Sequence, residues 1–466
     1  MKKSVIQKLV LITSDGLALC ASLILAVYVL NFIRPGAQEY IDFNRLGIAK
    51  LFGFSLLIVF WQQEHYTKRR PTWEEIKLLF ETIFIFAIIH FCLTYLVAHH
   101  IVKLVNAVFW VLLLFVLPFF RYISRCILLK LNLWQREIYI VGIANNAKDA
   151  LKILQQNRQL GYNIIGFITL SEGVSSLSNI NNIPVYTYNQ LSAQKKSIDT
   201  EVIFALEPEE LALNAKMIDI MQKKYTFVSV IPDSIGLPLY GAQLDHFFGS
   251  NQVLLRLKNN LSRRINRVIK RACDIVLSIC GLVLLSPVFM AFMLLILCSG
   301  NKVFFRHKRI GRAGKHFYCL KFQTMYANAA EILEKVLLTD KNAKEEWEKD
   351  FKLKHDPRVT KIGDFLRKTS LDEIPQLWNV LKGDMSLIGP RPIIDAEIEK
   401  YNDDFYYYKL VRPGVTGLWQ ISGRNDVDYQ NRVRLDVWYV KNWSLWYDFV
   451  IILRTVVVVL ARKGAY

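Results

Sequence analysis

The chain has 466 residues, which is enough for about three domains of ordinary size. It carries a formal net charge of +19 and a mean hydropathy of +0.23, whereas a basic soluble protein would normally be less hydrophobic. The basic residues flank apolar runs instead of forming one patch, so the pattern favours anionic lipid headgroups over nucleic acid as the partner. The seven cysteines lie mostly in apolar runs without a CxxC pair, so they indicate neither a disulfide framework nor a zinc site.

Four apolar segments occupy the first quarter of the chain: 9–33, 46–61, 78–98 and 104–120. A membrane span needs about 20 residues, and the second segment is short and contains Lys50. The first segment is too long for a cleavable signal peptide. Basic residues precede the first segment, separate the second from the third and follow the fourth, so the positive-inside rule places both ends in the cytoplasm. The sequence therefore predicts a transmembrane bundle of four helices within residues 1–130.

Residues 135–250 change to short β-type runs that alternate with helical stretches. The predicted strands are 137–142, 163–170, 201–207 and 227–233, and the predicted helices are 147–154 and the stretch around 208–224. This alternation is typical of a parallel, Rossmann-like sheet. Gly142 lies where a nucleotide-binding turn would begin, but Ala144 stands where a GxGxxG loop needs its second glycine. We therefore expect a structural or regulatory domain and not a working dinucleotide site.

Two further apolar runs lie in the C-terminal part. The run from Ile275 to Cys298 is long enough for a fifth span, but both of its flanks are strongly basic, which places both on the same side of the membrane. Ser286-Pro287 interrupts it, and each arm of roughly 12 residues, about 18 Å, is too short to cross about 30 Å of hydrocarbon. We expect a re-entrant helical hairpin over 273–298, in which Ser286 partners backbone groups freed at the kink. The later run, 447–461, is expected to form a packed or interfacial helix.

Two adjacent carboxylates, Asp372 and Glu373, lie at a predicted helix start in a ring of cations. These cations are Arg367, Lys368 and Arg391. A carboxylate alone would repel a phosphate, whereas guanidinium groups and Mg²⁺ remove that repulsion and stabilise the charge that develops in phosphoryl transfer. The same residues also fit a purely structural interpretation, because Ser370 and Glu373 have the spacing of a capping box and Asp372 complements the helix dipole.

From Arg263 onward the chain resembles the polyprenyl-phosphate hexose-1-phosphate transferases, the bacterial sugar transferases that begin glycan assembly on a lipid carrier. The motifs that carry the resemblance are at 273–289, 304–325, 356–392 and 411–429. They cover a catalytic domain at 263–466, and the layout before it is similar to that of the large, membrane-embedded branch. One position departs from the pattern, because Gln323 stands where the family has arginine.

The resemblance implies that hexose-1-phosphate passes from a UDP-sugar to undecaprenyl phosphate, with release of UMP, in O-antigen, capsule or exopolysaccharide synthesis. It implies that Asp372 is the nucleophile and forms an aspartyl-phosphosugar, and that Glu373 and Asp372 bind Mg²⁺. Within the family the galactose-specific members are the most similar, so UDP-galactose is the expected donor and UDP-glucose the alternative. The implied location is the bacterial inner membrane, with the active site facing the cytoplasm, membrane lipids as partners and a homodimer as a further expectation.

The expected substrate-binding residues are Lys321, Arg367, Arg391, Arg412, Arg424 and Asp426. Arg391 lies between two prolines that restrict its backbone, which suits a rigid phosphate or uridine contact. Arg367 either clamps a phosphate or pairs with Asp364. Two alternatives remain for the whole chain: a nucleotide-sensing membrane scaffold that docks partners, and a nicotinamide-dependent enzyme that uses the middle domain.

Overall fold

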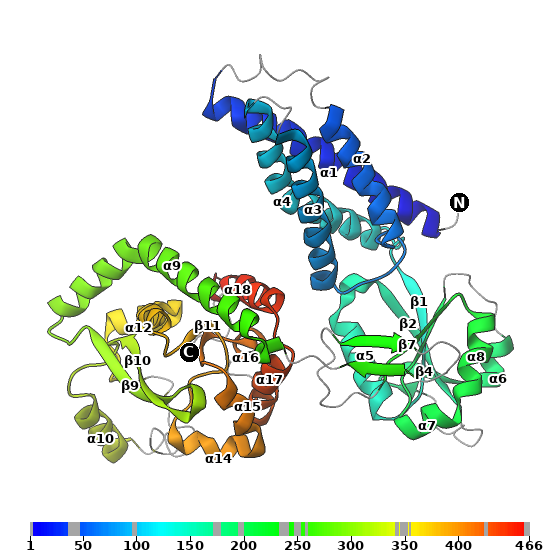
Figure 1. Cartoon of the computed structure of the whole chain (residues 1–466). Coiled ribbons are helices and arrows are strands. Elements are labelled where there is room, and N and C mark those ends of the chain that lie inside the picture. Colours follow the sequence, from blue (N-terminus) through cyan, green and yellow to red (C-terminus); the bar gives the residue numbers. More distant parts are fainter. Residues whose placement is uncertain are drawn as a thin grey trace. The chain divides into compact units, whose positions relative to one another are not determined.

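The computed structural model forms two compact units, Met1–Asp233 and Ser234–Tyr466 (Figure 1). It describes residues 3–35, 47–95, 100–170, 179–193, 200–232, 242–246, 253–256, 260–340, 344, 353, 356–423 and 427–460. The domain boundaries expected from the sequence, 1–130, 135–250 and 263–466, stay a prediction.

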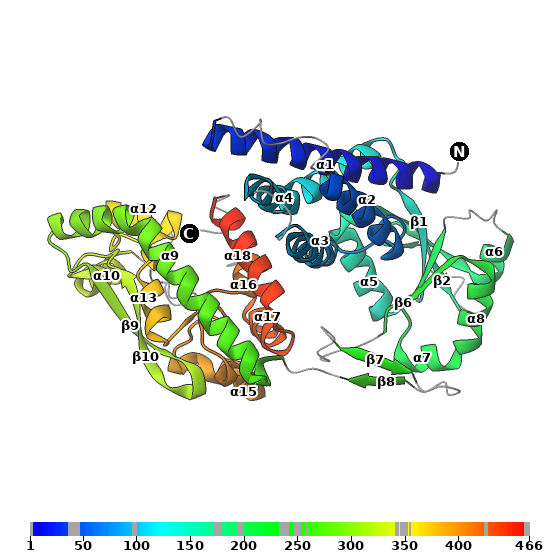
Figure 2. The ribbon, with the colours of Figure 1, turned by 45° about the horizontal axis from the view of Figure 1, so that its top comes forward.

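The N-terminal helices are α1 (Lys3–Ile33), α2 (Gly47–Gln62), α3 (Thr72–Tyr95) and α4 (His100–Lys130), and α1 packs mainly along α4 (Figure 2). Three of them, α1, α3 and α4, are long and apolar enough to cross a membrane. The predicted second span is a helix, but its 16 residues reach only about 24 Å at 1.5 Å per residue. The structure therefore supports three spans by length in this region and leaves α2 short of one.

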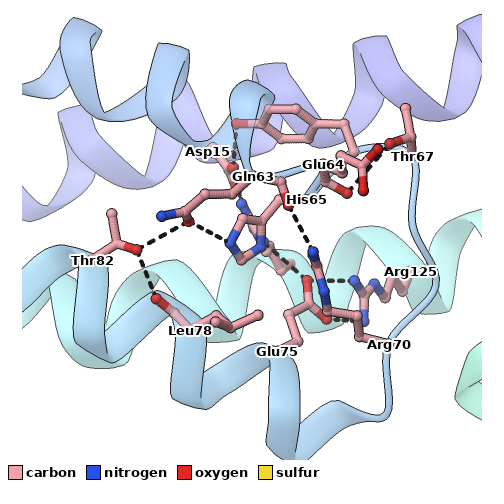
Figure 3. Close-up of polar contacts among 12 residues, drawn as sticks. Asp15, Gln63, Glu64, His65, Thr67, Arg70, Glu75, Leu78, Thr82 and Arg125 are labelled. Atoms are coloured by element: carbon pink, nitrogen blue, oxygen red, sulfur yellow. Dashed lines mark hydrogen bonds and ion pairs between the residues drawn. The ribbon is translucent and has the colours of Figure 1, made fainter. Parts of the chain in front are cut away.

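A buried network of charges holds the bundle together at one end (Figure 3). The guanidinium of Arg121, on α4, donates to both carboxylate oxygens of Asp15, on α1, at 2.9 and 2.6 Å. It also donates to Glu75 Oε1, on α3, at 2.9 Å, while Arg125 bonds the same carboxylate at 2.5 Å. Tyr66 donates to Asp15 at 2.8 Å. Because buried charges are tolerated only when they are paired, this network constrains how α1, α3 and α4 meet.

A six-stranded sheet follows in the same unit, with the order β3-β4-β2-β1-β5-β6. Its strands are β1 (Arg136–Val141), β2 (Tyr162–Thr169), β3 (Asn179–Ile180), β4 (Ile183–Thr187), β5 (Glu201–Phe204) and β6 (Phe227–Val230), and its helices are α5 (Asn145–Gln156), α6 (Tyr188–Ala193), α7 (Pro208–Leu213) and α8 (Ala215–Lys224). All pairings are parallel except that of β3 with β4. The four predicted strands are confirmed. The strands β3 and β4 were not predicted, because β3 has two residues and β4 is only half-buried, so neither forms a buried apolar run.

The second unit contains three short two-stranded ladders and a larger set of helices. Its main elements are β7 (Gln243–His246), β8 (Val253–Arg256), α9 (Arg264–Cys298), β9 (Phe304–Ile310), β10 (His316–Phe322), α10 (Ala329–Thr339), α12 (Lys361–Thr369), α13 (Gln376–Lys382), β11 (Ser386–Ile388), α14 (Ile398–Tyr401), α15 (Phe405–Leu410), β12 (Gly414–Thr416), α16 (Leu418–Ile421), α17 (Tyr429–Lys441) and α18 (Leu445–Leu460). The ladders β7/β8 and β9/β10 are antiparallel, whereas β11 and β12 are parallel. Tyr401 and Tyr408 are the largest fully buried side chains of this unit.

The apolar run expected to form a hairpin is one continuous 35-residue helix, α9, with Pro287 inside it. Figures 1 and 2 show this ribbon bending along its length. Proline lacks the N–H that would bond the carbonyl of Val283, and Ser286 Oγ donates to that oxygen at 2.8 Å instead, as the sequence led us to expect. Only 6% of its most apolar stretch is buried, so α9 is a fourth helix suited to a membrane. The re-entrant course of this helix stays a prediction.

Candidate active site

A cleft of about 820 Å³ lies in the second unit, and most of the predicted site residues open onto it. Several of its polar side chains come from segments far apart in the sequence: Arg309, Lys321, Thr324, Arg367, Asp372, Glu373, Arg391 and Gln420. Arg309, Thr324 and Gln420 were not predicted from the sequence. The cleft therefore gathers two carboxylates and several cations from β9, β10, α12, the turn after α12 and the segment after β11.

The carboxylate pair lies on a tight turn between α12 and α13. Ser370 ends α12 in the left-handed conformation, at φ 58°, and Leu371–Glu373 form one turn of 3₁₀ helix. The capping box suggested by the sequence does not form, because the Ser370 side chain makes no capping hydrogen bond and α13 begins only at Gln376. The carboxylate of Glu373 is used elsewhere, in a contact with Lys321 on β10. The turn thus presents both carboxylates to the cleft.

Lys321 bridges the two carboxylates. Its ammonium donates to Glu373 Oε1 at 2.7 Å and reaches Asp372 Oδ2 at 3.5 Å. Burial lowers the pKa of Lys321, but Glu373 and Asp372 outweigh burial and the pKa is raised, so this side chain is charged. Burial raises the pKa of Asp372 and Glu373 adds to the rise, whereas Lys321 and Arg367 oppose it. The result is a basic carboxylate next to fixed positive charges.

Arg367 is aimed into the cleft by a hydrogen bond from its Nε to Thr324 Oγ1 at 3.0 Å. The alternative ion pair with Asp364 does not form, because Asp364 pairs with Lys368 at 2.6 Å on the exposed side of α12. Burial lowers the pKa of the Arg367 guanidinium, and Asp372 is the carboxylate that most opposes this shift. The Arg367 side chain therefore lines the cleft close to Asp372, the candidate nucleophile, and only its Nε is used by Thr324.

Arg391 lies in the same cleft beside an aromatic ring. Its guanidinium carbon is 5.6 Å from the centroid of Trp419, and Arg432 lies 4.3 Å from the same ring. Among the described residues Arg391 forms no ion pair, so its charge is available to an anion. Trp419 and Arg432 were not predicted as site residues. Trp419 lies on α16 and Arg432 on α17, and the two meet only because these helices pack together.

The three remaining predicted substrate-binding residues are not found among the lining residues of the cleft. Arg412 does not line the cleft, and its Nε donates to the carbonyl of Gly383 at 2.7 Å. Arg424 and Asp426 lie outside the described residues. Gln323, which departs from the family pattern, does line the cleft and donates to the carbonyl of Met325 at 3.0 Å.

The crevice where a Rossmann-like sheet binds a dinucleotide is occupied by side chains of the chain itself. Strand order reverses between β1 and β5, and Asn146, in the first turn of α5, bonds the carbonyls of Leu206 and Ile231 at 2.9 and 3.2 Å. Its backbone N–H donates to Glu207 Oε1 at 3.1 Å. A pyrophosphate would use this helix N-terminus, and the carboxylate there would repel it. Asn146 and Glu207 thus take up the helix N-terminus that a pyrophosphate would need, and the role of this domain stays a prediction.

Comparison with known proteins agrees with the resemblance seen in the sequence. Residues 265–462 match the bacterial sugar transferase family. The chain is 41% identical to the undecaprenyl-phosphate galactose phosphotransferase of Salmonella typhimurium, over 98% of this chain and 97% of the relative. It is 39% identical to the UDP-galactose-lipid carrier transferase of Erwinia amylovora, over 100% and 98%. It is 38% identical to the UDP-glucose:undecaprenyl-phosphate glucose-1-phosphate transferase of Escherichia coli, over 51% and 50%. The chain belongs to the bacterial sugar transferase family.

Proposed function

We propose that the protein transfers hexose-1-phosphate from a UDP-sugar to undecaprenyl phosphate and releases UMP, as the first membrane step in the synthesis of a surface polysaccharide. The observation that carries this proposal is the Asp372–Glu373 pair, held by Lys321 in a cleft that also contains Arg367 and Arg391. Galactose-1-phosphate is the favoured group, because two of the relatives matched along nearly their full length are named for galactose. Glucose-1-phosphate is the alternative, supported by the partial match to the Escherichia coli enzyme.

In the proposed mechanism, a carboxylate oxygen of Asp372 attacks the β-phosphorus of the UDP-sugar. The bond from that phosphorus to the bridging oxygen breaks, and UMP leaves with the bridging oxygen and its electron pair. A phosphate oxygen of undecaprenyl phosphate then attacks the phosphorus of the aspartyl-phosphosugar, which forms the lipid diphosphate and frees the carboxylate. The raised pKa of Asp372 makes it a better nucleophile, and Lys321 and Arg367 offset the charge of the incoming phosphates.

The carboxylate pair also fits a magnesium ion. The described residues contain no group of three or more protein ligands, so a fully protein-built metal cage is not available there. Mg²⁺ usually binds one or two carboxylates and takes its other ligands from substrate phosphates and water, and Asp372 and Glu373 would supply the two carboxylates. A bound Mg²⁺ would neutralise charge on the donor diphosphate.

We place the active site at the cytoplasmic headgroup plane of the inner membrane. The support is that α9 is apolar, largely unburied and flanked by basic residues on both sides, and that it contains Pro287. A re-entrant α9 would hold the cleft where a soluble donor and a lipid acceptor both have access. Membrane lipids are then direct partners of this helix.

The test is UMP release by the purified full-length protein from a panel of UDP-sugars, with undecaprenyl phosphate and Mg²⁺. Asp372→Asn is the inactive variant, and Asp364→Asn, at the exposed carboxylate on α12, is the matched control. UMP formed only with UDP-galactose, and lost only in Asp372→Asn, would establish reaction and donor. UMP formed with another sugar would change the donor alone. If the folded protein gave no UMP with any sugar, the enzyme proposal would be wrong and the scaffold alternative would replace it.

A further inference from the structure

The cleft that holds the carboxylate pair continues into an apolar part. This part is lined by Leu285 on α9, Phe322 on β10, Leu377 on α13, and Thr455, Val458 and Val459 on α18. The diphosphate, ribose and hexose of a UDP-sugar are polar, and its one flat ring, uracil, does not need an apolar wall built from several elements. The apolar part therefore calls for a second ligand, one with a hydrocarbon chain.

The wall on α18 is one face of a helix. Thr455, Val458 and Val459 follow the i, i+3, i+4 spacing that places side chains on the same side. They are half-buried, whereas Val456 and Val457 between them are 52% and 65% exposed. One apolar face of α18 therefore lines the cleft and another points away from it.

The opposite wall on α9 has the same arrangement. Leu285 lines the cleft, while its neighbour Leu284 is 79% exposed. An apolar face inside the cleft and an apolar face outside it belong to the same helix turn.

The two helices are joined near their N-terminal ends within the unit. Lys270, on α9, forms a largely buried ion pair with Asp448, on α18, at 2.7 Å. Tyr439 and Trp443 also donate to Asp448, at 2.7 and 3.0 Å. Further along α18, the hydroxyls of Thr455 and Thr416 are hydrogen-bonded at 2.8 Å, which ties the wall to β12. These contacts join α18 to α9 at one end and to β12 beside the cleft.

We propose that the groove between α9 and α18 binds the first isoprenoid units of the acceptor lipid. This inference rests on the proposed function and adds to it the path of the acceptor. The phosphate of a polyprenyl phosphate must reach Asp372, so the carbon chain attached to it must leave the cleft on an apolar route towards the bilayer. The face of α18 that lines the cleft carries no charged side chain, which is what a desolvated hydrocarbon requires.

Paired tryptophan substitutions test the groove. Val459→Trp and Leu285→Trp fill it, while Val457→Trp and Leu284→Trp add the same bulk to adjacent, outward-facing positions. Filling the groove should raise KM for undecaprenyl phosphate by about tenfold, because displacing two buried methylene groups costs about that factor. KM for the UDP-sugar should stay unchanged in all four variants. Equal lipid KM values at the inner and outer positions would overturn the proposal.

A second measurement does not depend on turnover. Photoreactive benzoylphenylalanine replaces Val459 or Val457 in the full-length protein, and each protein is irradiated in phospholipid vesicles that contain undecaprenyl phosphate. Position 459 should label undecaprenyl phosphate, and an excess of unlabelled polyprenyl phosphate should suppress the labelling. Position 457 should label bulk phospholipid. Labelling of phospholipid alone at both positions would mean a general lipid contact and would refute the acceptor groove. Absence of UMP release by the unmodified protein would instead refute the proposed function.

Discussion

Lys321 Nζ lies 2.7 Å from Glu373 Oε1 but 3.5 Å from Asp372 Oδ2, so the two adjacent carboxylates are held unequally. The Asp372 side chain is also the more buried of the two, at 13% exposure against 31%. The closer ion pair restrains Glu373, whereas Asp372 keeps a looser contact and more freedom to approach a phosphorus atom. This asymmetry fits the roles proposed for them, a nucleophile at Asp372 and an orienting or metal-binding group at Glu373.

Lys321→Met should reduce the rate of UMP release by on the order of 10²-fold, because a fixed cation next to the developing charge is lost. It should also change the pH profile. The nucleophile must be ionised, so activity falls as the pH drops through the pKa of Asp372, and Lys321 lowers that pKa. Removing Lys321 should therefore move the acid limb to higher pH. Rates measured from about pH 4 to about pH 9 report this shift.

The control for this experiment is Lys368→Met. Lys368 is an exposed lysine on α12 that pairs with Asp364 and does not line the cleft. The Lys368→Met variant should release UMP at the wild-type rate and keep the acid limb of the pH profile at the wild-type position. If the acid limb of the Lys321→Met protein were not shifted, Lys321 would have no effect on the pKa that controls the ionisation of Asp372.

The buried carboxyl group of Asp436 should make the free energy of unfolding depend on pH. It is buried on α17, where burial raises its pKa to about 7, and the hydrogen bond from Tyr401 at 2.8 Å opposes that rise. The folded state thus holds the proton more tightly than the unfolded state, in which the pKa is about 3.9. This contribution is complete below about pH 4 and is lost as the pH rises towards about 7, at no more than about 1.4 kcal/mol per pH unit.

The unfolding midpoint of the wild-type protein should therefore fall between about pH 5 and about pH 7, and the Asp436→Asn variant should lose this component of the slope. Scanning fluorimetry in detergent measures both. Asp403→Asn, at an exposed position, serves as the comparison and should keep the wild-type slope. Parallel pH curves for wild type and Asp436→Asn would show that Asp436 is not the titrating group.

The residues of the site differ in how far they could be predicted from the sequence. Asp372 and Glu373 stood out because both carboxylates and their cations lie close together in the chain. Ser286 could be predicted because a proline always frees the carbonyl four residues before it. The turn at Ser370 could not be predicted, because the Glu373 carboxylate bonds Lys321, and Lys321 lies on a strand much earlier in the chain. Local spacing supported the capping box, and a tertiary ion pair displaced it.

Other contacts left no signal in the sequence. Asp15 lies inside the first apolar segment, whereas Glu75 and Arg121 border the third and the fourth, and only the packing of three helices brings them together. Trp419 belongs to a segment rich in aromatic residues, and nothing in its neighbourhood marks it as the ring beside Arg391. The strands β1, β2 and β5 were predictable for the opposite reason, because burial on both faces gives continuous apolar runs. The half-buried end strand β6 was predictable only because its own residues are mostly apolar.

Pro287→Ala tests the membrane course of α9. Alanine supplies the N–H that proline lacks, so the helix should straighten, and 35 residues at 1.5 Å each are long enough to span. A reporter cysteine at Asn301, in a chain without other cysteines, should react with an impermeant thiol reagent from the cytoplasmic side in the wild-type background. In Pro287→Ala part of the population should react from the opposite side.

The matched control is Pro118→Ala, at a proline inside α4. It should leave the labelling of the Asn301 reporter unchanged, because α4 is a different helix of a different unit. Labelling from the opposite side already in the wild-type background would show that α9 spans the membrane and would contradict the re-entrant proposal.

Arg121→Met should destabilise the N-terminal bundle by about 3–5 kcal/mol, because it leaves the buried carboxylate of Asp15 without a cation and that of Glu75 with Arg125 alone. The loss should be recovered in part by the triple variant Asp15→Asn, Glu75→Gln, Arg121→Met, which removes the uncompensated charges and keeps the shape of the side chains. Arg125→Met should destabilise the bundle less than Arg121→Met, because Glu75 still has Arg121 as a partner in that variant. Thermal unfolding of the full-length protein in detergent ranks the three. A single Arg121→Met variant as stable as the triple variant would mean that the buried carboxylates take up protons, and that their pairing with Arg121 contributes little to the stability of the bundle.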